Sequence, residues 1–101
     1  MIKYILKGHK PVKVEDVLEW EKWFETADRV VKQETLSDGK FVSTVFLGLD
    51  YNFRTIGKPL LFETMVFNEE GNYTDLDVDR YPTWEEAEKG HTNMVAKWKG
   101  Q

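Results

Sequence analysis

The sequence has no cysteine and, among its 101 residues, only two histidines and three prolines. Without cysteine the chain cannot form a disulfide scaffold or a thiolate zinc site. The histidines, His9 and His91, do not have the spacing of a zinc-binding motif, so we expect no metal site. The absence of cysteine also suits a reducing cytoplasm.

Long hydrophobic runs are missing as well. No apolar segment approaches the roughly 18 residues that a membrane span needs. The opening stretch MIKYILKGHKPVKV alternates lysine with apolar residues and has no small-residue cleavage site, so it does not indicate a signal peptide. We therefore expect no association with a membrane.

The chain also lacks an excess of positive charge. The formal net charge is −4, whereas proteins that bind duplex nucleic acid usually carry a basic surface. General nucleic-acid binding is therefore not expected. The charge is nevertheless uneven, because residues 1–13 carry four lysines and no acid, while residues 69–79 carry five acids and no base. Two solvated faces are the simpler interpretation, and a local basic patch is the alternative.

The remaining composition is that of a folded domain. Hydrophobic residues make up 41% of the chain, aromatic residues 14% and charged residues 32%, which excludes a disordered chain. The length fits one domain over residues 1–101. There is no repeat and no low-complexity linker that would divide it.

Hydrophobic periodicity predicts two helices and four or five strands. Apolar residues recur at helical spacing over residues 14–28, and again after Thr83 and Glu86, which form a capping box. Alternating or β-branched segments predict strands at residues 2–8, 29–36, 40–49, 60–67 and 75–81. Residues 73–81 are open to two interpretations, a strand edge protected by its acids or a loop.

These elements predict an α+β fold in the order β-α-β-β-β-α, with one further strand before the last helix if 73–81 is a strand. We expect a mostly antiparallel sheet of four to five strands with two helices packed on one face. Both faces of the strands at 40–49 and 60–67 are apolar. Since the helices cover one face only, the other face predicts a contact with a second copy, and hence a homo-oligomer.

Glu63 lies in the middle of the apolar run LLFETMVF. A buried carboxylate is costly unless it is paired, so we expect Glu63 to be a buried polar residue with a partner. A structural ion pair is the leading interpretation, and a ligand-binding or acid–base role and simple exposure are the alternatives. The candidate partners are Arg29, Arg54, Arg80 and His91.

The connection between these two strands, residues 50–58, is long for adjacent strands, and such connections are often functional. Its aromatic residues could stack on a ring and its cations could bind phosphate. Residues near the last helix could approach the same place, although His91 also fits a core position with one satisfied ring nitrogen. The predicted ligand-binding set is Tyr51, Asn52, Arg54, Lys58, Arg80, Tyr81, Trp84 and His91.

Catalytic motifs are not found. No Ser/His/Asp or Cys/His arrangement stands out. The acids of residues 75–86 have the spacing of a calcium-binding loop, but Arg80 stands at the position where the turn of such a loop requires glycine. The sequence therefore predicts no catalytic residues and no cofactor, and it favours a non-enzymatic role.

The segments STVFLGLDYNF, GKPLLFETMVF and RYPTWEEAEKGHTNMV, together with residues 4–31, resemble a family of small proteins from tailed bacteriophages and prophages. The resemblance implies an accessory, counter-defence protein in the cytoplasm of an infected bacterium. Such proteins either sequester nucleotide-like immune signals as homo-oligomers or inhibit a host defence protein by contact. The two-sided apolar sheet and the 50–58 connection favour sequestration of a small anionic ligand, and the alternatives are protein-binding inhibition or a small enzyme acting on a nucleotide.

Overall fold

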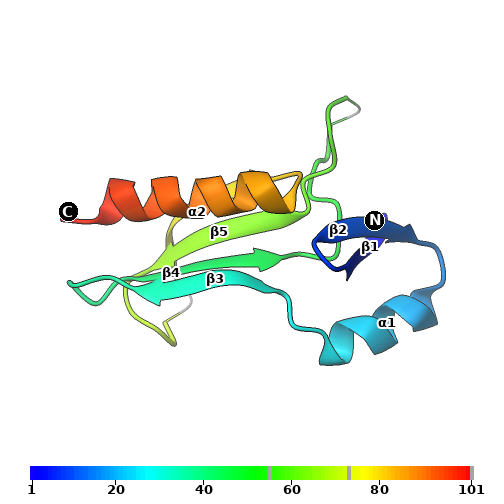
Figure 1. Cartoon of the computed structure of the whole chain (residues 1–101), viewed down its shortest axis with the longest axis horizontal. Helices are drawn as coiled ribbons and strands as arrows, with labels where there is room; N and C mark the ends of the chain where they lie inside the picture. Colours follow the sequence, from blue (N-terminus) through cyan, green and yellow to red (C-terminus); the bar gives the residue numbers. More distant parts are fainter. Residues whose placement is uncertain (55, 73, 101) are drawn as a thin grey trace.

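A computed structural model describes residues 1–54, 56–72 and 74–100. Thr55 and Tyr73, which fall within the predicted segments 50–58 and 73–81, lie outside the described residues. The elements are β1 (Lys3–Lys7), β2 (Lys10–Val14), α1 (Val17–Thr26), β3 (Val30–Thr35), β4 (Phe41–Phe46), β5 (Phe62–Phe67), β6 (Asp75–Tyr81) and α2 (Trp84–Trp98). The molecule measures 44 × 31 × 23 Å along its principal axes, and Figure 1 shows its arrangement.

The predicted α+β class with a four-stranded antiparallel sheet is confirmed. The sheet has the order β3-β4-β5-β6, and a separate antiparallel pair joins β1 to β2. Helix α2 packs along the large sheet, whereas α1 packs against β1 and β2. The fold thus differs from the expected order by one additional strand, β2, and by the position of α1 on this hairpin.

Helix α2 begins where the capping box predicts. The Thr83 hydroxyl oxygen accepts a 3.1 Å hydrogen bond from the Glu86 backbone N–H, which satisfies one of the free donors at the start of the helix. Ala87 and Met94 then face the sheet and are buried. They join two apolar clusters, one around Val42 and Val66 and the other around Phe46, Leu61 and Phe62.

The hairpin β1–β2 is attached to the chain just after β4. The Tyr4 N–H donates to the Gly48 carbonyl at 2.9 Å, and the Trp20 indole of α1 donates to the Tyr4 and Gly48 carbonyls at 3.1 Å each. Gly48 has a φ of +78°, and a Cβ there would lie 3.0 Å from the Phe24 ring. A glycine is therefore required at the point where the hairpin, α1 and the end of β4 meet.

The sheet face opposite α2 is partly covered by the chain itself. Phe41 and Phe67 stack on this face and are 8% and 6% exposed in the isolated chain. Glu70, in the connection from β5 to β6, lines the same hollow of about 250 Å³ as Phe41 and Phe67. A second copy is therefore not needed to bury these rings, and the homo-oligomer remains a prediction. Among the described residues, no helix is long and apolar enough to cross a membrane.

Candidate functional site

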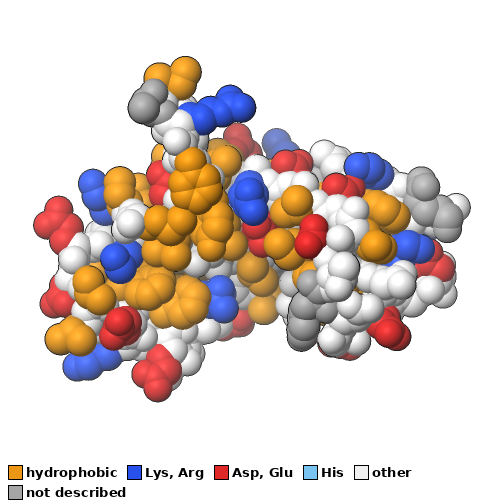
Figure 2. Space-filling model, turned by 180° about the vertical axis from the view of Figure 1, so that it is seen from behind, with side chains coloured by type: hydrophobic (Ala, Val, Ile, Leu, Met, Phe, Trp, Pro, Cys, Tyr) orange, Lys and Arg blue, Asp and Glu red, His pale blue; other side chains and the backbone are white. Residues whose placement is uncertain are grey.

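The predicted loop between β4 and β5 projects from the body of the molecule (Figures 1 and 2). Two side chains close it. The Asp50 carboxylate accepts from the backbone N–H groups of Asn52 and Leu60 at 2.7 and 3.0 Å. The Asn52 amide donates to the carbonyls of Ile56 and Lys58 at 3.2 and 2.8 Å. Because these bonds span the loop, its two sides are held together.

Asn52 is therefore engaged within the loop. Its amide oxygen also accepts from the Arg54 N–H at 3.0 Å, so both ends of its side chain bind backbone. In this structure the Asn52 side chain positions the backbone around it, and its predicted contact with a ligand stays a prediction. Turn chemistry of this kind is common for Asx residues, which bond backbone groups a few residues on.

The end of the loop presents apolar and basic side chains together, as Figure 2 shows. Phe53 is 74% exposed and Ile56 is 77% exposed, and Arg54 and Lys58 are also exposed. The loop surrounds an open hollow of about 670 Å³. The hollow is lined by Tyr51, Asn52, Phe53, Arg54, Ile56, Gly57, Lys58 and Leu60.

Arg80 connects the base of this loop to the sheet. Its Nε donates to the Glu63 carboxylate at 2.8 Å, and its guanidinium lies 5.2 Å from the centroid of the Tyr51 ring. Glu63 and Arg80 face each other across β5 and β6. Glu63 is 8% exposed, so it is a buried carboxylate with a partner, and that partner is one of the four candidates considered from the sequence.

His91, also predicted at the loop, belongs instead to the sheet-facing side of α2 and is completely buried. Its Nδ1 is 2.6 Å from the Thr44 hydroxyl, and its Nε2 is 2.8 Å from the Glu34 carboxylate. The Thr44 hydroxyl in turn lies 2.6 Å from that of Thr64. Both ring nitrogens are therefore satisfied, one more than predicted, and in this structure the ring has no exposed surface at the loop.

The order carboxylate, imidazole and hydroxyl in Glu34, His91 and Thr44 is also that of a hydrolase triad. A triad nucleophile must reach its substrate, but Thr44 is 0% exposed. In this conformation the three groups therefore form a buried polar network. Because each of the described contacts satisfies a group that would otherwise be costly to bury, the network stabilises the packing of α2 on the sheet.

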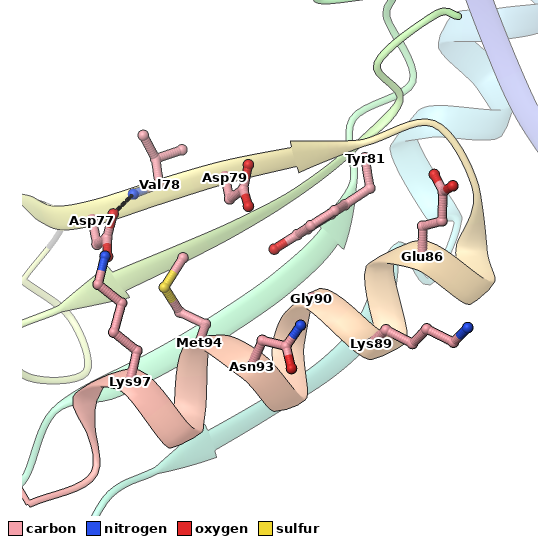
Figure 3. Close-up of a pocket in the computed structure, with 10 residues that line it drawn as sticks. All are labelled: Asp77, Val78, Asp79, Tyr81, Glu86, Lys89, Gly90, Asn93, Met94 and Lys97. Carbon is pink, nitrogen blue, oxygen red and sulfur yellow. Dashed lines mark hydrogen bonds and ion pairs between the residues drawn. The ribbon is translucent and has the colours of Figure 1, made fainter.

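Tyr81 lies away from the loop, in a groove of about 370 Å³ between β6 and α2. Figure 3 shows its ring lying across the helix at Gly90. A Cβ at Gly90 would come within 2.1 Å of this ring, so the glycine creates the space that Tyr81 fills. Burial raises the pKa of Tyr81 above its ordinary value, although a hydrogen bond with Thr64 lowers it.

The same groove contains Asp77, which links β6 to the end of α2. Its carboxylate accepts from the Lys97 ammonium at 2.7 Å and from the Trp98 indole at 2.9 Å. The hydrogen bond from Lys97, followed by that from Trp98, holds the pKa of Asp77 below its ordinary value. Asp77 also accepts from the next backbone N–H, that of Val78 (Figure 3), and Asp79 does the same for Arg80. These two N–H groups of the edge strand are thus occupied, as expected for an edge guarded by acids.

Trp84, the last of the predicted residues, lies at the tip of the β1–β2 hairpin. The His9 ring stacks on it with centroids 3.7 Å apart and planes 4° apart. Lys7 and Lys10 line a hollow there with Trp84. The sequence indicated a possible basic patch in the acid-free segment 1–13, but it did not predict the contact between His9 and Trp84.

The structure thus brings Tyr51, Asn52, Arg54 and Lys58 together at one loop, with Arg80 at its base. It separates them from Tyr81, Trp84 and His91. Among the described residues there is no cluster of three or more side chains that could hold a metal ion. Comparisons with protein-family models, with curated proteins and with solved structures gave no match to this chain.

Proposed function

We propose that this chain is a non-enzymatic binding protein that docks onto another protein through the loop at residues 50–60. One observation carries this proposal: Phe53 and Ile56 are about three-quarters exposed at the end of a loop that Asp50 and Asn52 hold closed. Burying an exposed side chain of this size releases roughly 1.5–3 kcal/mol. A partner surface that covers both would therefore gain substantial binding energy.

The hydrogen bonds that hold the two sides of the loop together favour the same function. A loop that is already ordered loses less conformational entropy when it binds, so more of the contact energy remains as affinity. Arg54 and Lys58 are exposed beside the apolar residues and form no ion pair among the described residues. The matching partner surface is an apolar cleft with carboxylates on its rim, because such a rim complements two cations.

Sequestration of a small anionic, nucleotide-like ligand is the second candidate. It is supported by the lining of the loop hollow, where two aromatic rings, Tyr51 and Phe53, accompany the cations Arg54 and Lys58. Rings could stack on a base while the cations bind phosphate. The hollow is open, whereas ligand sites generally enclose most of their ligand. In this candidate a second copy of the chain closes the hollow, which makes the protein a homo-oligomer.

Both candidates fit the accessory, counter-defence role in the bacterial cytoplasm that the phage resemblance implies. The two candidates differ in what the loop at residues 50–60 binds. A protein partner makes the chain an inhibitor of a host protein, whereas a nucleotide makes it a sponge for a host signal.

Site-specific photo-crosslinking distinguishes them. A photoreactive phenylalanine analogue replaces Phe53 in one variant and Leu76, an exposed residue of β6, in the control, and each variant is irradiated in bacterial cells. We expect one discrete heterologous crosslink from position 53 and none from position 76. The absence of a discrete product at position 53, or the same product at both positions, would contradict docking through the loop.

The purified chain is incubated in parallel with a panel of nucleotides, heated, and its supernatant separated by chromatography. Depletion followed by intact recovery would support the sponge, and an altered nucleotide would show an enzyme. If docking on a protein is the function, every nucleotide remains in solution unchanged.

A further inference from the structure

We infer that the tip of the β1–β2 hairpin is a binding site for a phosphate group, held between Lys7 and Lys10 beside the start of α2. This site is separate from the loop at residues 50–60 and does not depend on the function proposed for that loop.

The first reason is the register of the hairpin. Lys7 and Lys10 are directly opposite each other across β1 and β2, at the turn where Gly8 has a φ of +63°. Like charges in directly opposite positions destabilise a strand pair. An anion between the two ammonium groups would turn this repulsion into two attractive contacts.

The second reason is that the described part of the chain does not neutralise these charges. Lys32, Lys40 and Lys97 each form an ion pair with a carboxylate. Lys7 and Lys10 form none with any described residue, although Glu85 lines the same hollow. Both lysines are exposed and therefore accessible to an anion from solution.

The third reason is a hollow that the two lysines share with the aromatic stack at the hairpin tip. Lys7, His9, Lys10 and Trp84 help to surround a space of about 350 Å³. The stack of His9 on Trp84 fixes the hairpin tip against the first turn of α2, a helix of 15 residues. The start of α2 also borders this hollow, and its first turn carries Glu85 and Glu86, so the two lysines supply the positive charge of the site. The adjacent rings favour a phosphate carried by a ring-bearing molecule as well as the free ion.

The probe for this site is inorganic phosphate, titrated into the labelled protein at constant ionic strength and followed by the amide resonances of Gly8 and His9 in NMR spectra. We expect saturable shifts for the unchanged chain. Lys7→Gln/Lys10→Gln should weaken the fitted affinity at least about tenfold. The matched control is Lys3→Gln/Lys13→Gln, which removes the same charge from the same hairpin and should retain the affinity. Adenosine monophosphate and adenosine, titrated in the same way, distinguish a phosphorylated ring compound from the free ion as the preferred ligand.

A second measurement does not depend on detecting the ligand. Lys10→Glu replaces the repulsion by an attractive pair, so it should raise the unfolding temperature in chloride, and this gain should shrink in phosphate of equal ionic strength. Shifts that do not saturate, or equal losses of affinity in both double variants, would overturn the site. So would a Lys10→Glu effect that is the same in both salts.

Discussion

At the scale of single residues, Gly90 determines how closely β6 packs against α2, because glycine has no side chain. Gly90 lies in the middle of the helix, where glycine is about 1 kcal/mol less favourable than alanine. Glycine at this position leaves space for the Tyr81 ring, because a Cβ here would lie 2.1 Å from that ring. The Tyr81 hydroxyl also lies near enough to Thr64 for that residue to lower the pKa of Tyr81, so the space at Gly90 brings the aromatic side chain of β6 up to the buried network.

The first prediction compares the helix propensity of residue 90 with its contact with the Tyr81 ring. Helix propensity alone would make Gly90→Ala stabilising by about 1 kcal/mol, whereas the clash with Tyr81 costs roughly 1–3 kcal/mol. We expect a net loss in the free energy of unfolding, measured by urea denaturation. Thr92→Ala, at an exposed position of the same helix, is the control. A stabilised Gly90→Ala variant, or a loss that persists in a Tyr81→Ala background, would contradict this account.

The second prediction concerns the buried ion pair. Glu63→Ala should lower the free energy of unfolding by roughly 1–3 kcal/mol, because it leaves Arg80 without its hydrogen-bond acceptor. Glu70→Ala removes an exposed carboxylate nearby and should change stability by less than about 0.5 kcal/mol. Equal effects of the two substitutions in urea denaturation would show that the Glu63–Arg80 pair does not stabilise the sheet.

At the scale of secondary-structure elements, the contact between β6 and α2 depends on a charged group. Asp77 binds both Lys97 and Trp98 at the end of the helix, and its pKa is lower in the folded chain than its ordinary value of 3.8. A carboxylate with a lowered pKa contributes stability above the pKa of the unfolded chain. This contribution is lost as the pH falls through the lowered value.

The third prediction follows from the lowered pKa of Asp77. Asp77→Asn should lower the free energy of unfolding by about 1 kcal/mol at pH 7, because it removes charge-assisted hydrogen bonds. The difference from the unchanged chain should shrink below about pH 3.8, where the unfolded chain binds the proton first. Urea denaturation between pH 7 and pH 3 measures this difference in the free energy of unfolding. The control is Asp75→Asn, which changes an exposed acid of the same strand. A difference that stays constant with pH would mean that the charge of Asp77 is not involved.

Most elements were predictable from local patterns. The strands at the centre of the sheet are rich in β-branched and aromatic residues, and α2 begins with a capping box, so their positions agree with the structure to within a few residues. β2 was missed because its sequence, KPVKV, contains Pro11 and two lysines, and proline usually argues against a strand. A short hairpin at the edge of the fold tolerates it.

The candidate site was predictable only where it is local in sequence. Tyr51, Asn52, Arg54 and Lys58 come from one loop and necessarily lie near one another. The positions of His91 and Tyr81 depend on how α2 is rotated against the sheet. The contact between His91 and Glu34, for instance, joins residues 57 positions apart, and periodicity does not specify such a pair.

At the scale of the whole molecule, the apolar core and the loop proposed for recognition occupy separate regions. The two apolar clusters consist of residues from the hairpin, the helices, the large sheet and the segments that flank its strands. The side chains at the end of the 50–60 loop belong to neither cluster, and the loop projects from the body (Figure 2). Substitutions of Phe53 and Ile56 can therefore remove binding energy without removing core contacts.

The most direct test of this account compares two double variants that each replace two exposed apolar residues with serine. Phe53→Ser/Ile56→Ser changes the loop, and Leu76→Ser/Val78→Ser changes two exposed apolar residues of β6. Affinity for the protein that crosslinks to position 53 is measured by titration calorimetry, together with the unfolding temperature of each variant. Since a buried apolar anchor contributes about 2 kcal/mol or more, we predict at least about a hundredfold loss for the loop variant. The control should bind normally, and the loop variant should unfold at nearly the same temperature as the unchanged chain. Unchanged affinity of the folded loop variant would contradict the claim that this loop is the recognition element.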